Sequence, residues 1–308
     1  MTWLLLALAV LFLAPFAREA ARPTMSGRAR QDAPGQFADL PQGRTHYRWL
    51  GADSGPVAVC VHGLTTPSPV WTAIAEGLGE MGYRVLIYDL NGRGYSDRPR
   101  GLQDCAFFVR QLSDLLADQG IVNDVTLLGY SMGGAIVPAF AAQRPDMLRQ
   151  IVLIAPAGLG HDLGPGLRLM AGTGALGRWA MLSVYGRSMR RACAAQRDQP
   201  VSVPGITQIQ IGQLRHRGFI PAVLSSLHGA LNEHMEQAHR TIAAVGVPLL
   251  AIWGAADEII PPSGKDTLSD WNPDATHHIV PQAGHALPYS HSSDALKAMR
   301  PHLIHVAG

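Results

Sequence analysis

Residues 125–134 read VTLLGYSMGG and join an apolar run to a run of small residues. The first five are aliphatic, β-branched or small, which predicts a buried strand. The segment from Tyr130 to Arg144 predicts a helix that starts directly after this strand. Ser131 is therefore expected on a sharp strand-to-helix turn, where flanking glycines relieve backbone crowding. Such a turn raises a hydroxyl above the edge of a sheet, at a helix N-terminus that stabilises negative charge.

Short apolar runs alternate with helical patterns on both sides of this turn. The expected strands are 45–50, 57–62, 83–89, 125–129, 151–155, 247–254 and 277–280, and the expected helices are 71–81, 104–120, 130–144 and 294–306. Alternating strands and helices are typical of a mostly parallel sheet that is flanked by helices. The sequence therefore predicts an α/β fold.

The alternation stops at Gly158 and resumes after Arg240. The residues between them hold helical fragments without a convincing buried strand and are too many for a plain connection. We expect a helical lid between two halves of the sheet. Its apolar side chains suit either an acyl chain or ordinary packing; they are Leu167, Leu169, Met170, Leu176, Trp179, Met181 and Leu182. The expected organisation is a leader and linker (1–34), a first core half (43–157), the lid (158–240) and a second core half (241–308).

The C-terminal part supplies two partners for the serine. A serine hydroxyl needs a nearby base, which a third group must orient. Asp257 follows the expected strand 247–254, and His285 follows 277–280, so both lie past the carboxyl ends of parallel strands. Glu258 adjoins Asp257, but its position in the loop is less suitable. We therefore expect Ser131 as nucleophile, His285 as base and Asp257 as orienting acid.

Two backbone amides are candidates for holding an oxyanion. One belongs to Met132, directly after the serine, and the other to Leu64, in the loop after the expected strand 57–62. We expect His62 to brace this loop through hydrogen bonds rather than to transfer a proton.

Four motifs together resemble the α/β-hydrolase superfamily, in its esterase, lipase and peroxidase-like branch. They are His62-Gly63, the segment 89–99 (DLNGRGYSDRP), the turn at Ser131 and the pair Asp257 and His285. The resemblance covers nearly all of residues 43–308 apart from the lid. Within segment 89–99, Arg93 and Ser96 are interpreted as structural. Members with epoxide hydrolase or dehalogenase activity carry aspartate where Ser131 stands, which argues against both activities.

The leader suggests an association with a membrane. Residues 3–17 read WLLLALAVLFLAPFA and are followed by Arg18, Arg22, Arg28 and Arg30. The run is short for a spanning helix, and it lacks the basic start of a secretory signal. We expect an N-terminal anchor, with the body cytoplasmic because basic flanks stay inside. A cleaved signal, with a periplasmic or secreted body, and a soluble tail remain alternatives.

Composition limits the partners and the chemistry. A formal net charge of +2 gives no reason to expect nucleic acid. Cys60, Cys105 and Cys193 are far apart, so neither a disulfide framework nor a zinc site is expected. No metal or organic cofactor is implied, and the sequence does not give the oligomeric state.

The predicted function is the hydrolysis of carboxylic esters, lipid-like or small, through an acyl-serine intermediate. A finer resemblance, to membrane-anchored carboxylesterases and monoacylglycerol-lipase-like enzymes, rests on the leader and the size of the lid. The same three side chains also serve thioester or carbon–carbon bond hydrolysis, acyl transfer and perhydrolysis. A non-catalytic ligand-binding member of the fold is the alternative from another class.

Overall fold

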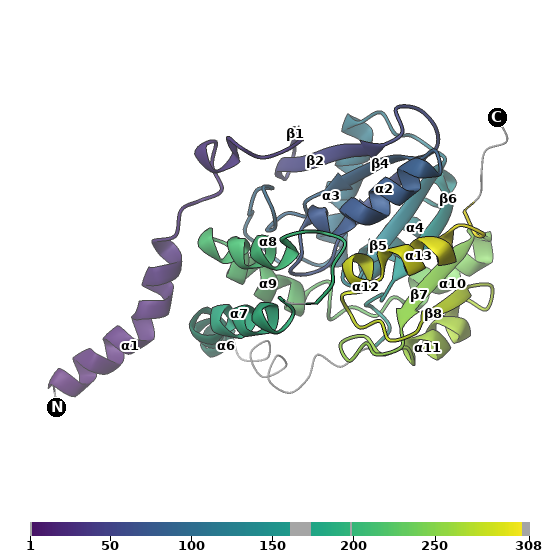
Figure 1. The fold of residues 1–308 in the computed structure, drawn as a ribbon. Helices are drawn as coiled ribbons and strands as arrows, with labels where there is room; N and C mark the ends of the chain where they lie inside the picture. Colours follow the sequence, from purple (N-terminus) through teal and green to yellow (C-terminus); the bar gives the residue numbers. More distant parts are fainter. Residues whose placement is uncertain (1, 161–173, 198, 304–308) are drawn as a thin grey trace.

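An eight-stranded sheet runs through the computed structural model, which describes residues 2–160, 174–197 and 199–303 (Figure 1). The strand order is β1-β2-β4-β3-β5-β6-β7-β8. Strand β2 pairs antiparallel with both β1 and β4, whereas β3 to β8 are all parallel to one another. The strands are β1 (Gln36–Leu40), β2 (Gly43–Gly51), β3 (Val57–Val61), β4 (Arg84–Tyr88), β5 (Val125–Tyr130), β6 (Leu148–Ile154), β7 (Leu249–Gly254) and β8 (Thr276–Val280). The expected α/β class and mostly parallel sheet are confirmed.

The central strands are buried on both faces, as their near-continuous apolar sequences require. Every residue of β5 and of β7 is buried. Side chains alternate across a strand, so Leu127 packs in one core and Leu128 in the other. Because these strands are parallel, their carboxyl ends lie at the same edge of the sheet. The loops that follow the strands at this edge are therefore held by a buried, rigid sheet.

Helices cover the two faces of the sheet in separate layers. One core contains side chains from α3, α4, α10 and α11, and the other contains side chains from α2, α12 and α13. The helices of these layers and the short turns near them are η1 (Arg28–Arg30), η2 (Ser68–Trp71), α2 (Thr72–Glu80), α3 (Cys105–Asp118), α4 (Gly133–Ala141), η3 (Pro145–Met147), α10 (Glu236–Val245), α11 (Gly264–Trp271), α12 (Leu287–Ser290) and α13 (Ser292–Met299).

The chain between β6 and β7, called the insertion here, consists of helices and connecting turns and contains no strand among its described residues. Besides α10 it contains α6 (Gly174–Ala180), the π-helical turn η4 (Met181–Tyr185), α7 (Gly186–Ala195), α8 (Ile206–Gly212), η5 (Gln213–Arg215) and α9 (Phe219–His228). Side chains of η4, α7, η5 and α9 form a separate core around Met181 and Phe219. The expected lid boundary at residue 240 falls inside α10, which packs on the sheet layer. Of the expected apolar set, Leu167, Leu169 and Met170 lie outside the described residues.

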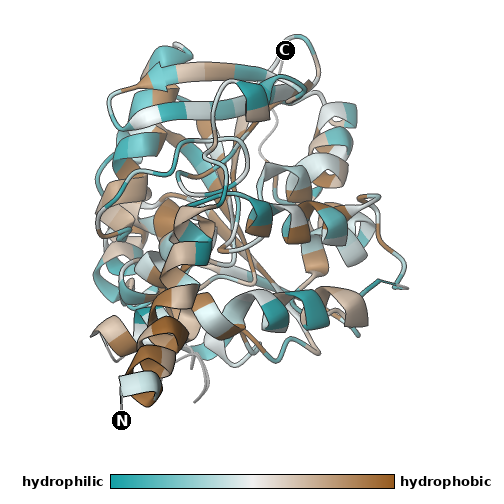
Figure 2. Ribbon diagram, turned by 90° about the vertical axis from the view of Figure 1, so that its left-hand side faces the viewer, coloured by the Kyte–Doolittle hydropathy of each residue, from teal (hydrophilic) through white to brown (hydrophobic). Residues whose placement is uncertain are grey.

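The expected leader forms one helix, α1 (Thr2–Ala20), which projects away from the body (Figures 1 and 2). Its side chains are exposed over most of its length, and Figure 2 shows its outer part as strongly hydrophobic. Its inner part contacts the insertion: the rings of Phe12 and Trp179 stack with centroids 6.4 Å apart. The linker that follows joins the fold through β1, which the sequence did not predict.

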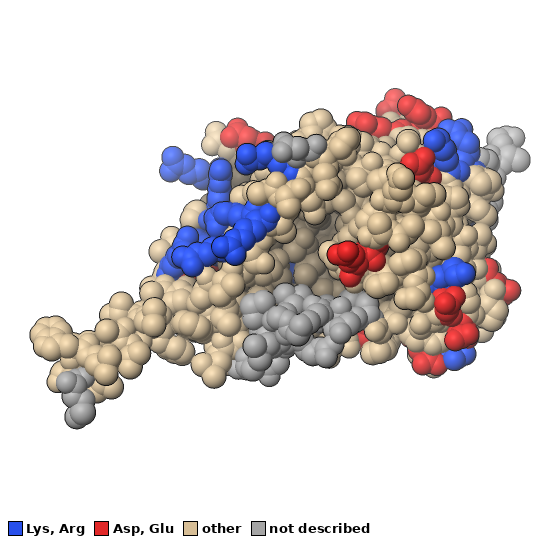
Figure 3. Space-filling model, turned by 60° about the horizontal axis from the view of Figure 1, so that its bottom comes forward, with Lys and Arg blue, Asp and Glu red and all other residues tan. Residues whose placement is uncertain are grey.

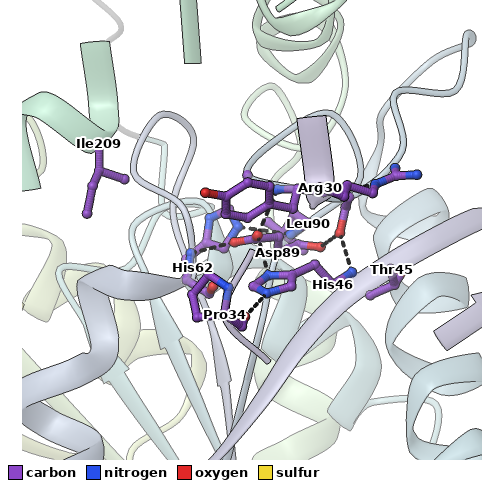
Figure 4. Close-up of polar contacts among 12 residues, drawn as sticks. Arg30, Pro34, Thr45, His46, His62, Asp89, Leu90 and Ile209 are labelled. Atoms are coloured by element: carbon purple, nitrogen blue, oxygen red, sulfur yellow. Dashed lines mark hydrogen bonds and ion pairs between the residues drawn. The ribbon is translucent and has the colours of Figure 1, made fainter. Parts of the chain in front are cut away.

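A buried carboxylate, Asp89, organises the loops that follow β3 and β4 (Figure 4). Its Oδ2 accepts hydrogen bonds from His46 Nδ1 at 2.8 Å and from the Tyr95 amide at 2.9 Å, and its Oδ1 accepts from the Ser68 amide at 2.8 Å. The other ring nitrogen of His46 contacts the Pro34 carbonyl. Since both ring nitrogens face acceptors, His46 is held as an imidazolium.

Charge pairing decides the protonation of this cluster. Burial alone would lower the pKa of His46, but the hydrogen bond and the charge of Asp89 outweigh burial and raise it. The same pairing overcomes burial at Asp89 and holds its pKa well below the ordinary value. The imidazolium and the carboxylate together tie the linker at Pro34 to the edge of the sheet.

The pair gives a pH-dependent contribution to stability. Folding raises the pKa of His46 above its ordinary value of 6.5, so its contribution is complete below about pH 6.5 and is lost as pH rises through the folded-state pKa. We expect His46→Gln to lower the free energy of unfolding by about 1–3 kcal/mol at pH 6 and by less at pH 9. Urea unfolding at both pH values measures the difference.

His278→Gln serves as the control, because His278 is exposed on β8. It should change the free energy of unfolding little at either pH. A loss for His46→Gln that is equal at pH 6 and pH 9 would contradict the charged state assigned to the native histidine.

Candidate active site

Ser131 occupies the turn between β5 and α4, in a conformation that few non-glycine residues adopt. Its φ is 53°, in the left-handed region, at a typical cost of about 1–3 kcal/mol. The turn also needs glycine at two neighbouring positions. A β-carbon at Gly129 would lie 2.5 Å from the Gly133 carbonyl oxygen, and one at Gly133 would lie 2.1 Å from the Val61 carbonyl oxygen. The G-x-S-x-G spacing is thus a packing requirement of this turn.

The three side chains singled out by the sequence lie in one hydrogen-bonded line. His285 Nε2 is 3.0 Å from Ser131 Oγ, and His285 Nδ1 is 2.8 Å from Asp257 Oδ2. Asp257 is 3% exposed, and its Oδ1 accepts from the amides of Ile259 and Ile260 at 2.9 Å each. This carboxylate is therefore fully hydrogen-bonded and fixed in orientation.

The carboxylate in this line belongs to Asp257, the acid that the sequence favoured, and the neighbouring Glu258 is exposed. Tyr130 holds the histidine loop, because its hydroxyl donates to the His285 carbonyl at 2.8 Å and its ring lies 5.3 Å from the imidazole. The sequence did not predict this contact. The only signal was the position of Tyr130 directly before Ser131.

The loop after β3 runs directly against the serine. A β-carbon at Gly63 would lie 3.0 Å from Ser131 Cβ, so the glycine permits this approach. The amides of Leu64 and Met132 have no hydrogen-bond acceptor within the part of the chain that the structure describes. Both are therefore free to donate to a ligand.

His62 fixes the peptide plane that carries the Leu64 amide. Its Nδ1 donates to the Gly63 carbonyl at 2.7 Å, and its Nε2 accepts from the Leu90 amide at 2.9 Å. In a trans peptide the carbonyl and the following N–H point in opposite directions. Burial lowers the pKa of His62 to about 4, so the ring is neutral and can accept as well as donate. This is the bracing role expected from the sequence.

A buried guanidinium connects the same loop to the insertion. Arg93 Nε donates to the Leu64 carbonyl at 3.0 Å, and its Nη1 donates to the Asn91 carbonyl at 3.0 Å. Its Nη2 donates to Ser226 Oγ at 2.8 Å and to the Ala222 carbonyl at 3.3 Å, both on α9. Burial lowers the pKa of Arg93 to about 9, which leaves it charged at neutral pH. Its contacts are structural, as the sequence indicated.

A cavity of 460 Å³ opens at the serine. Ser131, His285 and Leu64 line it from the sheet side. The insertion lines the other side through Tyr185, Ser188, Met189, Ala192, Cys193 and Gln196, among others. Apolar surface predominates around a few polar groups, as in sites for organic ligands. No group of three or more metal-binding side chains lies within the described ranges.

The sequence profile of the serine aminopeptidase S33 family (Hydrolase_4) matches residues 53–290, more than half of the chain. A monoacylglycerol lipase of Mycolicibacterium smegmatis is 31% identical over 76% of this chain and 82% of its own length. An N-formylmaleamate deformylase of Pseudomonas putida is 27% identical over 80% of this chain and 87% of its own length. Uncharacterized proteins of Mycobacterium match over 134 residues, and the matched part is 38% of their length.

Solved structures show the same fold at low sequence identity. The enol-lactonase of Burkholderia xenovorans superposes with a TM-score of 0.71 at 20% identity, over 86% of this chain and 98% of that one. A bacterial membrane phospholipase A superposes with a TM-score of 0.72 at 20% identity, over 97% of this chain and 94% of that one. Family and relatives support the expectation of an ester-cleaving hydrolase, and the expected fold is confirmed. The chain belongs to the serine aminopeptidase S33 family of α/β-hydrolases.

Proposed function

We propose that this chain hydrolyses carboxylic esters with Ser131 as nucleophile, His285 as general base and Asp257 as the group that orients the histidine. One observation carries the proposal: Ser131 Oγ, the two ring nitrogens of His285 and Asp257 Oδ2 form a continuous line at the floor of a cavity. A hydroxyl in hydrogen-bond contact with an oriented imidazole is the arrangement that nucleophilic catalysis needs.

In the first half-reaction, Ser131 Oγ attacks the ester carbonyl carbon while His285 Nε2 takes the hydroxyl proton. The carbonyl oxygen gains negative charge, which the amides of Leu64 and Met132 stabilise. Asp257 accepts from Nδ1–H and compensates the positive charge on the imidazole. The carbon–oxygen bond to the alcohol then breaks, and the alcohol leaves with the proton from Nε2.

In the second half-reaction, water attacks the acyl-serine. His285 takes a proton from the water, and the same two amides again hold the oxyanion. The bond to Ser131 Oγ breaks, Oγ regains its proton from Nε2, and the carboxylic acid departs. The cycle returns the enzyme to its starting state without a cofactor.

A lipid-like ester is the substrate class that the surroundings favour. The cavity is lined mainly by apolar groups, and a relative at 31% identity is named a monoacylglycerol lipase. Hydrolysis rates on short and long p-nitrophenyl esters, a monoacylglycerol, an acyl thioester and an aminoacyl p-nitroanilide separate ester cleavage from thioester and peptide-bond cleavage. We expect the highest kcat/KM on an oxygen ester with a medium or long acyl chain.

We further propose that α1 anchors the enzyme in a membrane. Among the described residues, α1 is the one helix long and apolar enough to cross a bilayer. Only 6% of its apolar 18-residue stretch is buried against the body. Its 19 residues extend about 28 Å at 1.5 Å per residue, close to the thickness of the hydrocarbon core. The arginines that follow it favour a cytoplasmic body.

Replacing the nucleophile should remove activity without unfolding the chain. We expect Ser131→Ala to lower kcat by about 10⁵–10⁶, since members of such a triad act as a unit. The midpoint of thermal unfolding should stay close to that of the wild type or rise, because alanine keeps the fold and only the hydroxyl is lost. Turnover within tenfold of the wild type would refute Ser131 as the nucleophile.

The two adjacent acids give a matched pair of variants. Asp257→Asn should lower kcat by about 10⁴, because the amide favours the wrong imidazole tautomer. Glu258→Gln removes an equal charge one residue away and should keep kcat within about tenfold of the wild type, since an exposed carboxylate is strongly screened. Steady-state kinetics on one ester would contradict the assignment if the two variants lost activity equally.

Deletion of residues 2–14 tests the anchor. It removes the exposed apolar part of α1 but keeps Glu19, whose Oε1 accepts from the Gly218 amide at 2.7 Å. We expect the full chain in carbonate-washed membranes and the deletion variant in the soluble fraction, with hydrolysis of a short ester retained. A wild-type chain whose mature N-terminus lies after residue 17 would show a cleaved signal instead.

A further inference from the structure

In the helical run α6-η4-α7 of the insertion, one face lines the cavity and another is exposed on the surface. Tyr185, Met189 and Cys193 recur at intervals of four residues and line the cavity, together with Gln196 one turn further on. Residues three or four apart share one face of a helix. The end of η4 and the helix α7 therefore form a wall of the candidate active site, and the opposite face of α7 points away from the cavity.

Basic side chains occupy the exposed surface of this run and the end that follows it. They are Arg178, Arg187, Arg190, Arg191 and Arg197, and all five are exposed. Residues 174–197 contain no Asp or Glu, and none of these arginines forms an ion pair with a residue that the structure describes. Figure 3 shows basic side chains gathered in a band on the side from which the N-terminal helix projects, whereas acidic ones lie mostly on the other side.

Exposed apolar side chains continue from this surface onto α1. Leu176 is 65% exposed and Val184 is 51% exposed. Between them, Trp179 stacks on Phe12 of α1, and its Nε1 donates to the Leu11 carbonyl at 3.4 Å. The apolar helix and the apolar part of the insertion thus form one surface, bordered by the arginines.

The position of this contact along α1 fixes how near the insertion comes to a bilayer. Only residues 2–10 of α1 precede the contact at Leu11, and nine helical residues extend about 14 Å. The hydrocarbon core is about 30 Å thick. If α1 enters a membrane while this contact is kept, the insertion therefore meets the membrane before α1 can cross it.

We propose that the arginine face of the α6-η4-α7 run binds the anionic phospholipid surface of the membrane that α1 enters, with Leu176 and Val184 among the acyl chains. The proposal rests on the membrane anchoring proposed above. Arginines that form no ion pair with a described residue, beside exposed apolar side chains, match both layers of such a surface: the anionic headgroups and the hydrocarbon. Because the other face of α7 walls the cavity, the enzyme draws its ester substrate from that lipid surface.

The contribution of the arginines to membrane binding should depend on the lipid charge and on the salt concentration. A basic residue at an anionic membrane surface contributes a factor of up to about five to binding. Salt screens this attraction, with a Debye length of about 8 Å at physiological ionic strength. A neutral bilayer, or high salt, should therefore remove the contribution and leave the apolar one.

The experiment uses the full chain in two kinds of vesicle, phosphatidylcholine alone and phosphatidylcholine with about a third phosphatidylglycerol. The test protein is a triple variant that combines Arg187→Gln, Arg190→Gln and Arg191→Gln. It is compared with a control variant that loses the same three positive charges elsewhere on the surface. The control combines Arg110→Gln, Arg240→Gln and Arg300→Gln, which are exposed positions away from α7. Hydrolysis of a monoacylglycerol within the bilayer and of a soluble short ester is measured for each.

We expect the wild type and the control to hydrolyse the bilayer ester at least about fivefold faster in anionic than in neutral vesicles at low salt. The triple variant should lose this difference, while its kcat/KM on the soluble ester stays unchanged. Raising the salt to about 0.5 M should abolish the difference for all three proteins. Equal lipid dependence in the triple variant and the wild type would overturn the proposal.

A fluorescent label reports insertion independently of activity. Cys60 and Cys105 are buried and Cys193 lines the cavity, so Leu176→Cys is labelled with an environment-sensitive dye in a Cys193→Ala background. Its emission should shift to the blue on anionic vesicles, whereas a label at Val122→Cys, which is 70% exposed on the core, should not respond. A label at residue 176 that stays in water while the chain is bound to vesicles would overturn the proposal and leave the anchor intact.

The remaining outcomes are also distinct. A wild-type chain that does not bind vesicles refutes the anchor, and this proposal with it. Absence of soluble-ester hydrolysis refutes the esterase assignment, whereas the label still reports on lipid binding. A label at residue 176 that is shielded without lipid, in a chain that sediments as a dimer, would assign this face to a second copy and overturn the proposal.

Discussion

The strained turn at Ser131 is the constraint on which the rest of the structure depends. With a left-handed serine between β5 and α4, the Met132 amide has no hydrogen-bond acceptor among the described residues, and the hydroxyl points at His285. The turn is stable because it is packed from several directions. Gly133 lies against the β3 backbone, Gly63 admits the neighbouring loop, and the Tyr130 hydroxyl holds the histidine loop. This turn therefore positions the Ser131 hydroxyl and the Met132 amide relative to the histidine and the loop after β3.

A second, buried layer of charge supports the loop that faces this turn. The pair Asp89 and His46 fixes the segment after β4. Arg93, within that segment, donates hydrogen bonds to the Leu64 carbonyl and to Ser226 on α9. His62 stays neutral and orients the peptide before Leu64. Burying an unpaired charge is costly, so each of these groups is satisfied by several partners. The loop that contains Leu64 and the insertion are thereby linked through the guanidinium of Arg93.

The sequence predicted those parts whose signals are local. Apolar runs identified the central strands, because buried parallel strands are apolar throughout, and the glycines around Ser131 identified the turn. The edge strand β1 was missed because it is short, pairs only with β2 and interrupts its apolar residues with Asp39. Contacts such as Tyr130 with His285, Arg93 with α9 and Phe12 with Trp179 join residues far apart in the chain. No pattern along the sequence indicates such partners, and the positions of the insertion helices depend on them.

The central claim is that His285 activates Ser131. The most direct test is to react the chain with a fluorophosphonate and to locate the covalent adduct. The hydrogen-bonded line predicts a single adduct on the full chain, located by peptide mass spectrometry at Ser131. The same reagent should label His285→Ala far more slowly, since His285 is the only base within hydrogen-bond distance of the Ser131 hydroxyl among the described residues. An adduct at another residue, or an equal labelling rate in the histidine variant, would contradict this mechanism.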